Sequence, residues 1–192
     1  FGNRTGLTRF EECHKCPPGS YCQLASTEPT ACMAGTYSSS WGWSLCADCA
    51  AGSFQDRTGQ QACKPCERGG YCTVAAVGTT PCRKGTFNNF TGMVSQANCS
   101  IGPAGTTCAL GAIIPVPCSP GSYSDVAGLE EYPCPGCVAG TYQDQESQTA
   151  CSVCDLGGYC VEGAAISTPC PPGRFGNRTG LTRFEECHKC PP

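Results

Sequence analysis

The chain has 192 residues, of which 21 are Cys, and its formal net charge is only −3. Leu, Ile, Val and Phe together account for about 14% of the residues, below the roughly 20% that an ordinary globular core needs, so a fold held together by a large hydrophobic core is excluded. No apolar run approaches the ~18 residues of a membrane span, and a pI near 5.3 without a basic cluster excludes nucleic acid as a partner.

The first feature along the chain is a repeat at its two ends. Residues 1–18 read FGNRTGLTRFEECHKCPP, and residues 175–192 are identical, at an offset of 174 residues. Two explanations stay open: a tandem array with a 174-residue unit, which we favour because the sequence opens and closes in mid-module, or an artificial duplication. In the array, residues 1–12 end a preceding module and residues 187–192 begin the next unit. Because neither an initiator Met nor a signal peptide precedes Phe1, we expect a longer protein.

The 174-residue unit consists of two similar halves, residues 13–98 and 99–186. The stretch AAGSFQDRTGQQACKPCERGGYC at 50–72 aligns with VAGTYQDQESQTACSVCDLGGYC at 138–160. Repetition at this scale predicts small modules that contact only their neighbours along the chain.

Each small module begins with the pattern Cys-x-x-Gly-x-aromatic. Gly supplies the backbone freedom for a tight turn, and the aromatic ring can lie over an adjacent disulfide as a miniature core. Short alternating stretches such as Gly-Thr-Tyr-Ser favour two-stranded hairpins over helices. We therefore predict small disulfide-rich modules of β-hairpin and irregular structure, stacked into an elongated rod, with little or no helix. In chain order, the complete copies begin at Cys16, Cys32, Cys49, Cys66, Cys82, Cys118, Cys137, Cys154 and Cys170.

This arrangement resembles the cysteine-rich repeats called GCC2/GCC3, or ephrin-type-A/B-receptor-like repeats, and is similar in style to the modules of tumour-necrosis-factor receptors. The resemblance rests on Cys-x-x-Gly-Thr-Tyr combined with Cys-x-x-Cys-x-x-Gly-x-Tyr-Cys, and it covers almost the whole chain. It implies extracellular rods of disulfide-bonded hairpins, but no single function.

The resemblance also implies a disulfide pairing, in which each hairpin is closed by its own flanking Cys. Cys13 is the copy of Cys187 and Cys190 is the copy of Cys16, so their partners would lie in neighbouring units. Each loop of about 14 residues would contribute roughly 3 kcal/mol in the chain-entropy picture. The implied pairs are Cys16–Cys22, Cys32–Cys46, Cys49–Cys63, Cys66–Cys72, Cys82–Cys99, Cys118–Cys134, Cys137–Cys151, Cys154–Cys160 and Cys170–Cys187.

Cys108 is left over in this pairing. Its module has Gly102 where the others have Cys, and Thr107 where they have an aromatic residue. We expect Cys108 to be free or bonded to another chain. The same module continues with the most apolar stretch of the sequence, which is either a contact surface or a set of residues packed against a neighbouring module: Leu110, Ile113, Ile114 and Val116.

Four of the five Asn residues lie in Asn-x-Ser/Thr motifs, namely Asn3, Asn89, Asn98 and Asn177. This confinement predicts N-glycans on exposed loops of a secreted protein, with coincidental motifs as the alternative. Asn98 is the weakest candidate, because the middle residue of its motif is Cys99.

Other chemistries find little support. The spacing Cys46-x2-Cys49-x13-Cys63-x2-Cys66, repeated at 134–154, comes close to a zinc ribbon, but further cysteines and the glycine-aromatic pattern speak against metal. One unit holds a single His, His14, and no phosphate-binding loop follows a buried strand. We therefore expect no enzyme activity and no cofactor beyond covalent N-glycans.

The functional prediction is an extracellular or cell-surface structural glycoprotein, whose tandem units form the shaft of a fibre or filament. Its expected partners are copies of itself and glycans, without nucleic acid or a membrane span. The alternative is a ligand-binding or adhesion ectodomain of a cell-surface receptor, and a zinc-binding protein is a minor alternative. Near-identical units favour the fibre, because receptors usually diverge from module to module.

Overall fold

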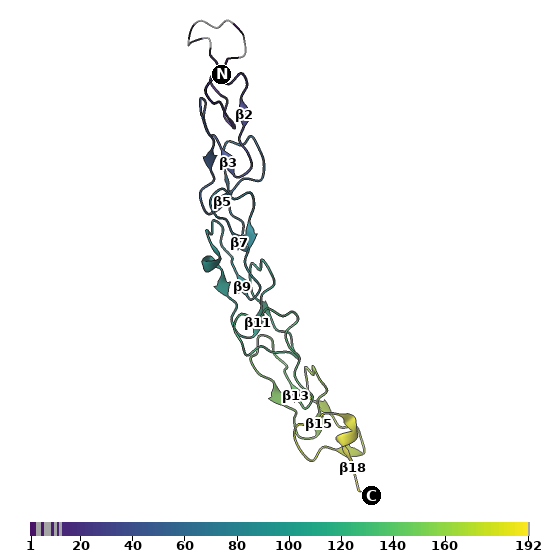
Figure 1. The fold of residues 1–192 in the computed structure, drawn as a ribbon. Coiled ribbons are helices and arrows are strands. Elements are labelled where there is room, and N and C mark those ends of the chain that lie inside the picture. Colours follow the sequence, from purple (N-terminus) through teal and green to yellow (C-terminus); the bar gives the residue numbers. More distant parts are fainter. Residues whose placement is uncertain (3–4, 6–8, 10, 12, 192) are drawn as a thin grey trace. The chain divides into compact units, whose positions relative to one another are not determined.

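The computed structural model describes residues 1–2, 5, 9, 11 and 13–191, and Figure 1 shows its ribbon. Nearly all regular structure in these residues consists of strands only two residues long, and helix is limited to short 3-10 turns such as η2 (Gln96–Asn98) and η3 (Phe184–Glu186). The predicted class, small disulfide-rich hairpin modules with little helix, is confirmed.

The described strands form nine antiparallel two-stranded sheets, each between neighbouring segments of the chain. The first strand of a pair follows the turn glycine and, except in β11, contains the aromatic residue, and the second precedes or follows a cysteine. The pairs are β1 (Ser20–Tyr21) with β2 (Thr30–Ala31), β3 (Thr36–Tyr37) with β4 (Ala47–Asp48), β5 (Ser53–Phe54) with β6 (Lys64–Pro65), β7 (Gly70–Tyr71) with β8 (Thr80–Pro81), β9 (Thr86–Phe87) with β10 (Ser100–Ile101), β11 (Thr106–Thr107) with β12 (Val116–Pro117), β13 (Thr141–Tyr142) with β14 (Ser152–Val153), β15 (Gly158–Tyr159) with β16 (Thr168–Pro169), and β17 (Arg174–Phe175) with β18 (His188–Lys189).

The turn before each first strand requires a glycine. Gly52, for example, has a φ of +86°, a conformation that side chains with a Cβ adopt only with strain. A Cβ on Gly52 would also lie 2.5 Å from the carbonyl oxygen of Gly92. Both constraints explain why glycine recurs at this position.

Backbone hydrogen bonds join each module to the next, and the step from Cys49 to Cys66 illustrates the pattern. The Gly52 N–H donates to the Cys72 carbonyl at 2.9 Å, and the Cys66 N–H donates back to the Gly52 carbonyl at 2.8 Å. The Ala75 N–H donates to the Cys49 carbonyl at 2.9 Å. Since these partners are main-chain atoms, the hydrogen bonds between modules depend little on side-chain identity outside the turn glycines.

The chain divides into two compact units, one formed by Phe1–Cys82 and Asn88–Cys99 and the other by Arg83–Phe87 and the residues from Ser100 onward. The first contains the sheets from β1 to β8, and the second the sheets from β9 to β18. The division of the sequence into halves 13–98 and 99–186 stays a prediction. No helix in the described part of the chain is long and apolar enough to cross a membrane.

Candidate functional site

The interior of the modules is built mainly from sulfur. The structure contains nine disulfide bonds, between the same pairs that the family resemblance implies. The Cα atoms of the bonded cysteines lie 5.6 to 6.0 Å apart, in the usual range. Most of these cysteines are fully buried, whereas few aliphatic side chains are. Covalent crosslinks therefore occupy the place that a hydrocarbon core takes in larger proteins.

Among the described residues, the miniature core expected beneath each aromatic ring is present at one position. Phe54 is 7% exposed and packs with the Cys66–Cys72 disulfide, and Ala76 contacts the same cluster. The other aromatic residues of the hairpins are half-buried, and Phe175 is exposed. These other rings therefore do not form a buried cluster with a disulfide.

Buried polar side chains, which the cysteine and glycine pattern did not predict, complete the interior. They occupy the position directly after the aromatic residue and hydrogen-bond the backbone. The Nε2 group of Gln55 donates to the Ala62 carbonyl at 2.7 Å, and its Oε1 accepts from the Arg57 N–H at 3.2 Å. No buried side-chain nitrogen or oxygen in the described residues lacks a hydrogen-bond partner, so hydrogen bonds offset the cost of removing these groups from water. Its members are Ser38, Gln55, Asn88, Ser124 and Gln143.

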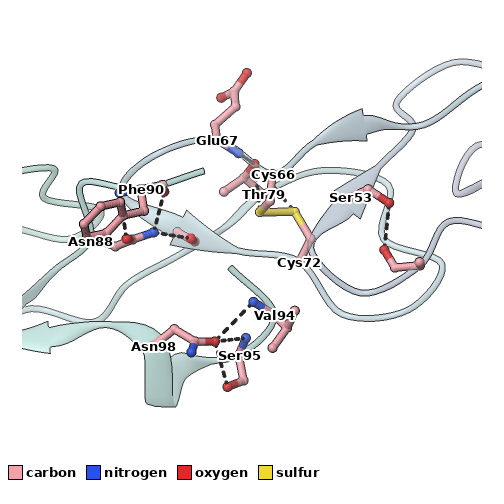
Figure 2. Close-up of a disulfide and its surroundings, with 12 residues drawn as sticks. Ser53, Cys66, Glu67, Cys72, Thr79, Asn88, Phe90, Val94, Ser95 and Asn98 are labelled. Carbon is pink, nitrogen blue, oxygen red and sulfur yellow. Dashed lines mark hydrogen bonds between the residues drawn. A yellow bond between two sulfur atoms is a disulfide. The ribbon is translucent and has the colours of Figure 1, made fainter. Parts of the chain in front are cut away.

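Figure 2 shows one of these interiors around the Cys66–Cys72 disulfide. The Thr79 hydroxyl lies 3.7 and 3.8 Å from the two sulfur atoms and accepts the Glu67 N–H at 3.2 Å. Nearby, the Asn88 Nδ2 group donates to the Gly70 carbonyl at 2.9 Å. The repetition of these polar types between the halves, Gln55 against Gln143, was the signal that could have revealed their structural role.

Two predicted glycosylation sites lie on the surface in equivalent positions. The side chains of Asn89 and Asn177 are exposed, and so are Thr91 and Thr179, which complete their motifs. Asn3 lies outside the described residues. An exposed acceptor with an exposed hydroxyl partner is the geometry that N-glycan attachment requires.

Asn98 is also exposed but has a structural role. Its Oδ1 atom accepts the Val94 N–H at 3.2 Å, the Ser95 N–H at 3.1 Å and the Ser95 hydroxyl at 3.3 Å. It thereby closes the turn that contains η2, as Figure 2 shows. Cys99, which follows it, is bonded to Cys82.

Cys108 has no disulfide partner and is fully buried. Burial raises the pKa of its thiol, because the thiolate is poorly solvated there. Cys108 forms no disulfide within this chain, and its bond to another chain stays a prediction. A bond from Cys108 to another chain would first require the module to open. Cys13 and Cys190 also lack a partner and are exposed.

The predicted contact residues near Cys108 all lie on the surface. Leu110, Ile113, Ile114 and Val116 are exposed by 62%, 46%, 64% and 43%. No neighbouring module in the described part of the chain buries them, and their proposed role in self-association stays a prediction.

The cysteines with zinc-like spacing are engaged in other bonds. Cys46 is bonded to Cys32, Cys49 to Cys63, and Cys66 to Cys72, so in this pairing they are not thiolate ligands. Among the described residues, no group of three or more His, Cys, Asp or Glu side chains could hold a metal ion.

Comparison with known families supports the module assignment. Residues 35–78 match the family model described as tyrosine-protein kinase ephrin type A/B receptor-like. The match spans strands β3 to β7 and confirms the resemblance for this stretch. A comparison with curated proteins found no match.

Proposed function

We propose that this protein is an extracellular, N-glycosylated structural protein whose tandem cysteine-rich units form the shaft of a surface fibre or filament. The observation that carries the proposal is the identity of residues 1–18 with residues 175–192 at an offset of 174 residues. An identical unit can be added repeatedly at the same spacing, which suits a fibre better than a receptor with one binding surface.

The bonds between modules support such an array. Along the described chain, each turn glycine accepts an N–H from the first residue of the next module, as in Cys66 to Gly52 and Cys154 to Gly140, at 2.8 and 2.9 Å. Near the end of the chain the Cys190 N–H donates to the Gly173 carbonyl at 3.0 Å. Since Cys190 is the copy of Cys16, the same bond would join one unit to the next.

The crosslinks support an extracellular location. Nine disulfides in 192 residues are stable only in an oxidising compartment. They also suit a fibre, because a crosslinked loop stays closed when the chain is pulled or diluted. Glycans at Asn89 and Asn177 would recur once per half unit and shield the surface from proteases.

Imaging of the native material tests the proposal. Antibodies against residues 35–78 would be used to purify and label the protein from the cell surface, followed by negative-stain microscopy. Regular filaments with antibodies bound at a constant spacing are expected. Discrete short particles that each bind one or two antibodies would contradict the fibre.

The second candidate is a ligand-binding or adhesion ectodomain of a receptor, and the family match at residues 35–78 favours it. It predicts that one module surface captures a protein ligand and that further units of the full-length chain diverge from this one. The full-length sequence discriminates the two: several near-identical 174-residue units support the fibre, and divergent units support the receptor.

Glycosylation is tested by removing the hydroxyl residue of each motif, which leaves every Asn in place. Thr91→Ala and Thr179→Ala should each lower the mass of the secreted chain by one glycan. Ser100→Ala is the matched test for Asn98, because it preserves the hydrogen bonds that Asn98 makes. A secreted chain whose mass equals that of the bare polypeptide would rule out the glycans.

A further inference from the structure

The disulfides leave one long segment of the chain without a crosslink. Between Cys16 and Cys187, consecutive closed loops are separated by either two or nine residues, with one exception. The exception is the 18-residue stretch from Ser100 to Pro117, between Cys99 and Cys118, which we term the open segment. Because a disulfide fixes the distance across its loop, residues outside closed loops supply most of the extension when the chain is pulled.

The open segment differs from the other short-loop modules by one missing sulfur atom. Gly102 and Cys108 are six positions apart, the same separation as in the Cys16–Cys22, Cys66–Cys72 and Cys154–Cys160 disulfides. A Cβ on Gly102 would lie 2.7 Å from the Cys108 Sγ atom. The Gly102 N–H also donates to the Gly85 carbonyl at 2.9 Å, as a cysteine does at this place in other modules. The backbone is therefore arranged for a crosslink that the sequence does not make.

Only noncovalent contacts keep the open segment folded. Strand β11 pairs with β12, and the Gly105 N–H donates to the Ser124 carbonyl at 2.8 Å. The Thr107 hydroxyl, which stands where other modules have an aromatic ring, donates to the Glu131 carbonyl at 2.6 Å. The Cys108 N–H donates to the Leu129 carbonyl at 3.3 Å. Each hydrogen bond contributes modestly to stability, and all of them can break without cleavage of a covalent bond.

We propose that the open segment is the extensible link of the 174-residue unit: it opens before the crosslinked modules under tension or mild denaturation, and its opening exposes the buried Cys108 thiol. A six-residue disulfide loop lowers the population of the open state about 40-fold in the chain-entropy picture, and this module lacks that restraint. The flanking Cys82–Cys99 and Cys118–Cys134 loops stay closed, so the opened segment remains tethered at both ends and can refold. The inference depends on the module alone and holds for a fibre or a receptor.

Native-state hydrogen exchange of the oxidised 192-residue chain tests this with matched amides. The Cys108 N–H is compared with the Cys22 N–H, which occupies the equivalent place and donates to the Trp43 carbonyl at 3.0 Å. After correction for intrinsic rates, the Cys108 amide should exchange about 40-fold faster. Equal protection of the two amides would overturn the proposal.

Two variants show whether the missing crosslink causes the faster exchange at the Cys108 amide. Gly102→Cys should bond to Cys108, lower the mass by two hydrogens relative to its reduced form, and slow exchange at Cys108 about 40-fold. Cys16→Gly recreates the open arrangement in the other half and should speed exchange at Cys22 by a similar factor. A Gly102→Cys chain that keeps both thiols free, or that bonds without slowing exchange, would contradict the inference.

Single-molecule stretching gives an independent measurement. The first extension step should release up to about 60 Å, the reach of an 18-residue segment at 3.3–3.6 Å per residue. The Gly102→Cys chain should show a first step shorter by about 15 Å, because residues 102–108 are then locked. A first step of about 30 Å in the wild-type chain, the reach of a nine-residue segment, would place the weakest point elsewhere.

Discussion

The loops closed by Cys82–Cys99 and by Cys170–Cys187 have the same length and the same kind of closing turn, but different side chains are buried inside them. Both span 17 positions, and both end in a short 3-10 turn directly before the second cysteine, η2 in the first and η3 in the second. We refer to them as the first and second large loops. Each also exposes a glycosylation motif in the same position, at Asn89 and Asn177.

The interiors of the two loops are chemically opposite. In the first, the buried amide of Asn88 donates to the Gly70 and Phe90 carbonyls, both at 2.9 Å. In the second, Gly176 has no side chain, and Leu181 is fully buried beside it. The disulfide and the backbone thus determine the shape of the loop, and its interior can hold either a polar or an apolar side chain.

The turns before the second cysteine are also closed by different groups. Asn98 accepts three hydrogen bonds in the first loop. In the second loop Glu186 takes this place and accepts the Thr182 hydroxyl at 2.6 Å and the Arg178 guanidinium at 3.1 Å. The Thr182 hydrogen bond and the nearby arginines lower the pKa of Glu186. An ionisable carboxyl group therefore closes one turn, and a neutral amide closes the other.

Removal of the crosslink should affect both loops most strongly and equally. Cys82→Ser with Cys99→Ser, and Cys170→Ser with Cys187→Ser, should each cost about 3 kcal/mol of opening free energy, because the two loops have the same length. Hydrogen exchange of the Gly92 and Gly180 amides measures this, since both donate across the module boundary at 2.9 Å. If only one of the two loops were destabilised, the buried side chains would contribute more to loop stability than the disulfide does.

Truncation of the apolar side chain inside the second large loop should have the next largest effect. Leu181→Ala should destabilise the second large loop by about 2–3 kcal/mol, because a fully buried side chain is replaced by a cavity. Exchange at the Gly180 amide is the measurement. The control is Met93→Ala at the equivalent, half-buried position of the first loop, where a smaller loss is expected. Equal losses would remove the contrast between the two interiors.

Loss of the polar side chain inside the first large loop should destabilise that loop somewhat less. Asn88→Ala should destabilise the first large loop by about 1–2 kcal/mol, because the Gly70 carbonyl and the Phe90 N–H lose their partners. The adjacent, exposed Asn89→Ala is the control and should change stability by less than about 0.5 kcal/mol. If Asn88→Ala proved neutral at the Gly92 amide, the buried amide would not hold the loop.

The pH response should be the smallest effect. Because the folded pKa of Glu186 is lowered, its contribution is present above the ordinary value of 4.5 and is lost as the pH falls through the lowered pKa. Protection at the Thr182 amide should therefore decrease between pH 5 and pH 2, and Glu186→Gln should abolish this dependence. The Ser95 amide in the first loop is the internal reference. A parallel decrease there would assign the response to the whole chain.

The hairpins could be predicted from sequence because their determinants are local. Glycine with positive φ and a closing cysteine recur at fixed spacing, and the pattern marks the turns directly. The polar interior could not be predicted in the same way. Gln55 and Ser38 are residue types that normally lie on the surface, and only the three-dimensional arrangement shows that backbone carbonyls surround them.

The aromatic residues show the opposite error. A ring beside a cysteine suggests a small core, but of the aromatic residues that the structure describes, Phe54 alone joins a buried cluster. The buried positions beside the disulfides are instead taken by polar side chains such as Gln55 and Gln143, which no spacing rule reveals. The role of Asn98 was hidden for a similar reason: the motif suggests a glycan acceptor, and the turn that the side chain closes exists only in the fold.

The main-chain bonds between modules have a consequence for how such a gene can change. Gly52 and Cys66 contact one another through main-chain N–H and C=O groups, which every amino acid except proline carries. An inserted, deleted or copied module would therefore meet a compatible neighbour on each side without matched substitutions. A chain joined in this way can grow by unequal crossing-over, while its surface residues diverge independently.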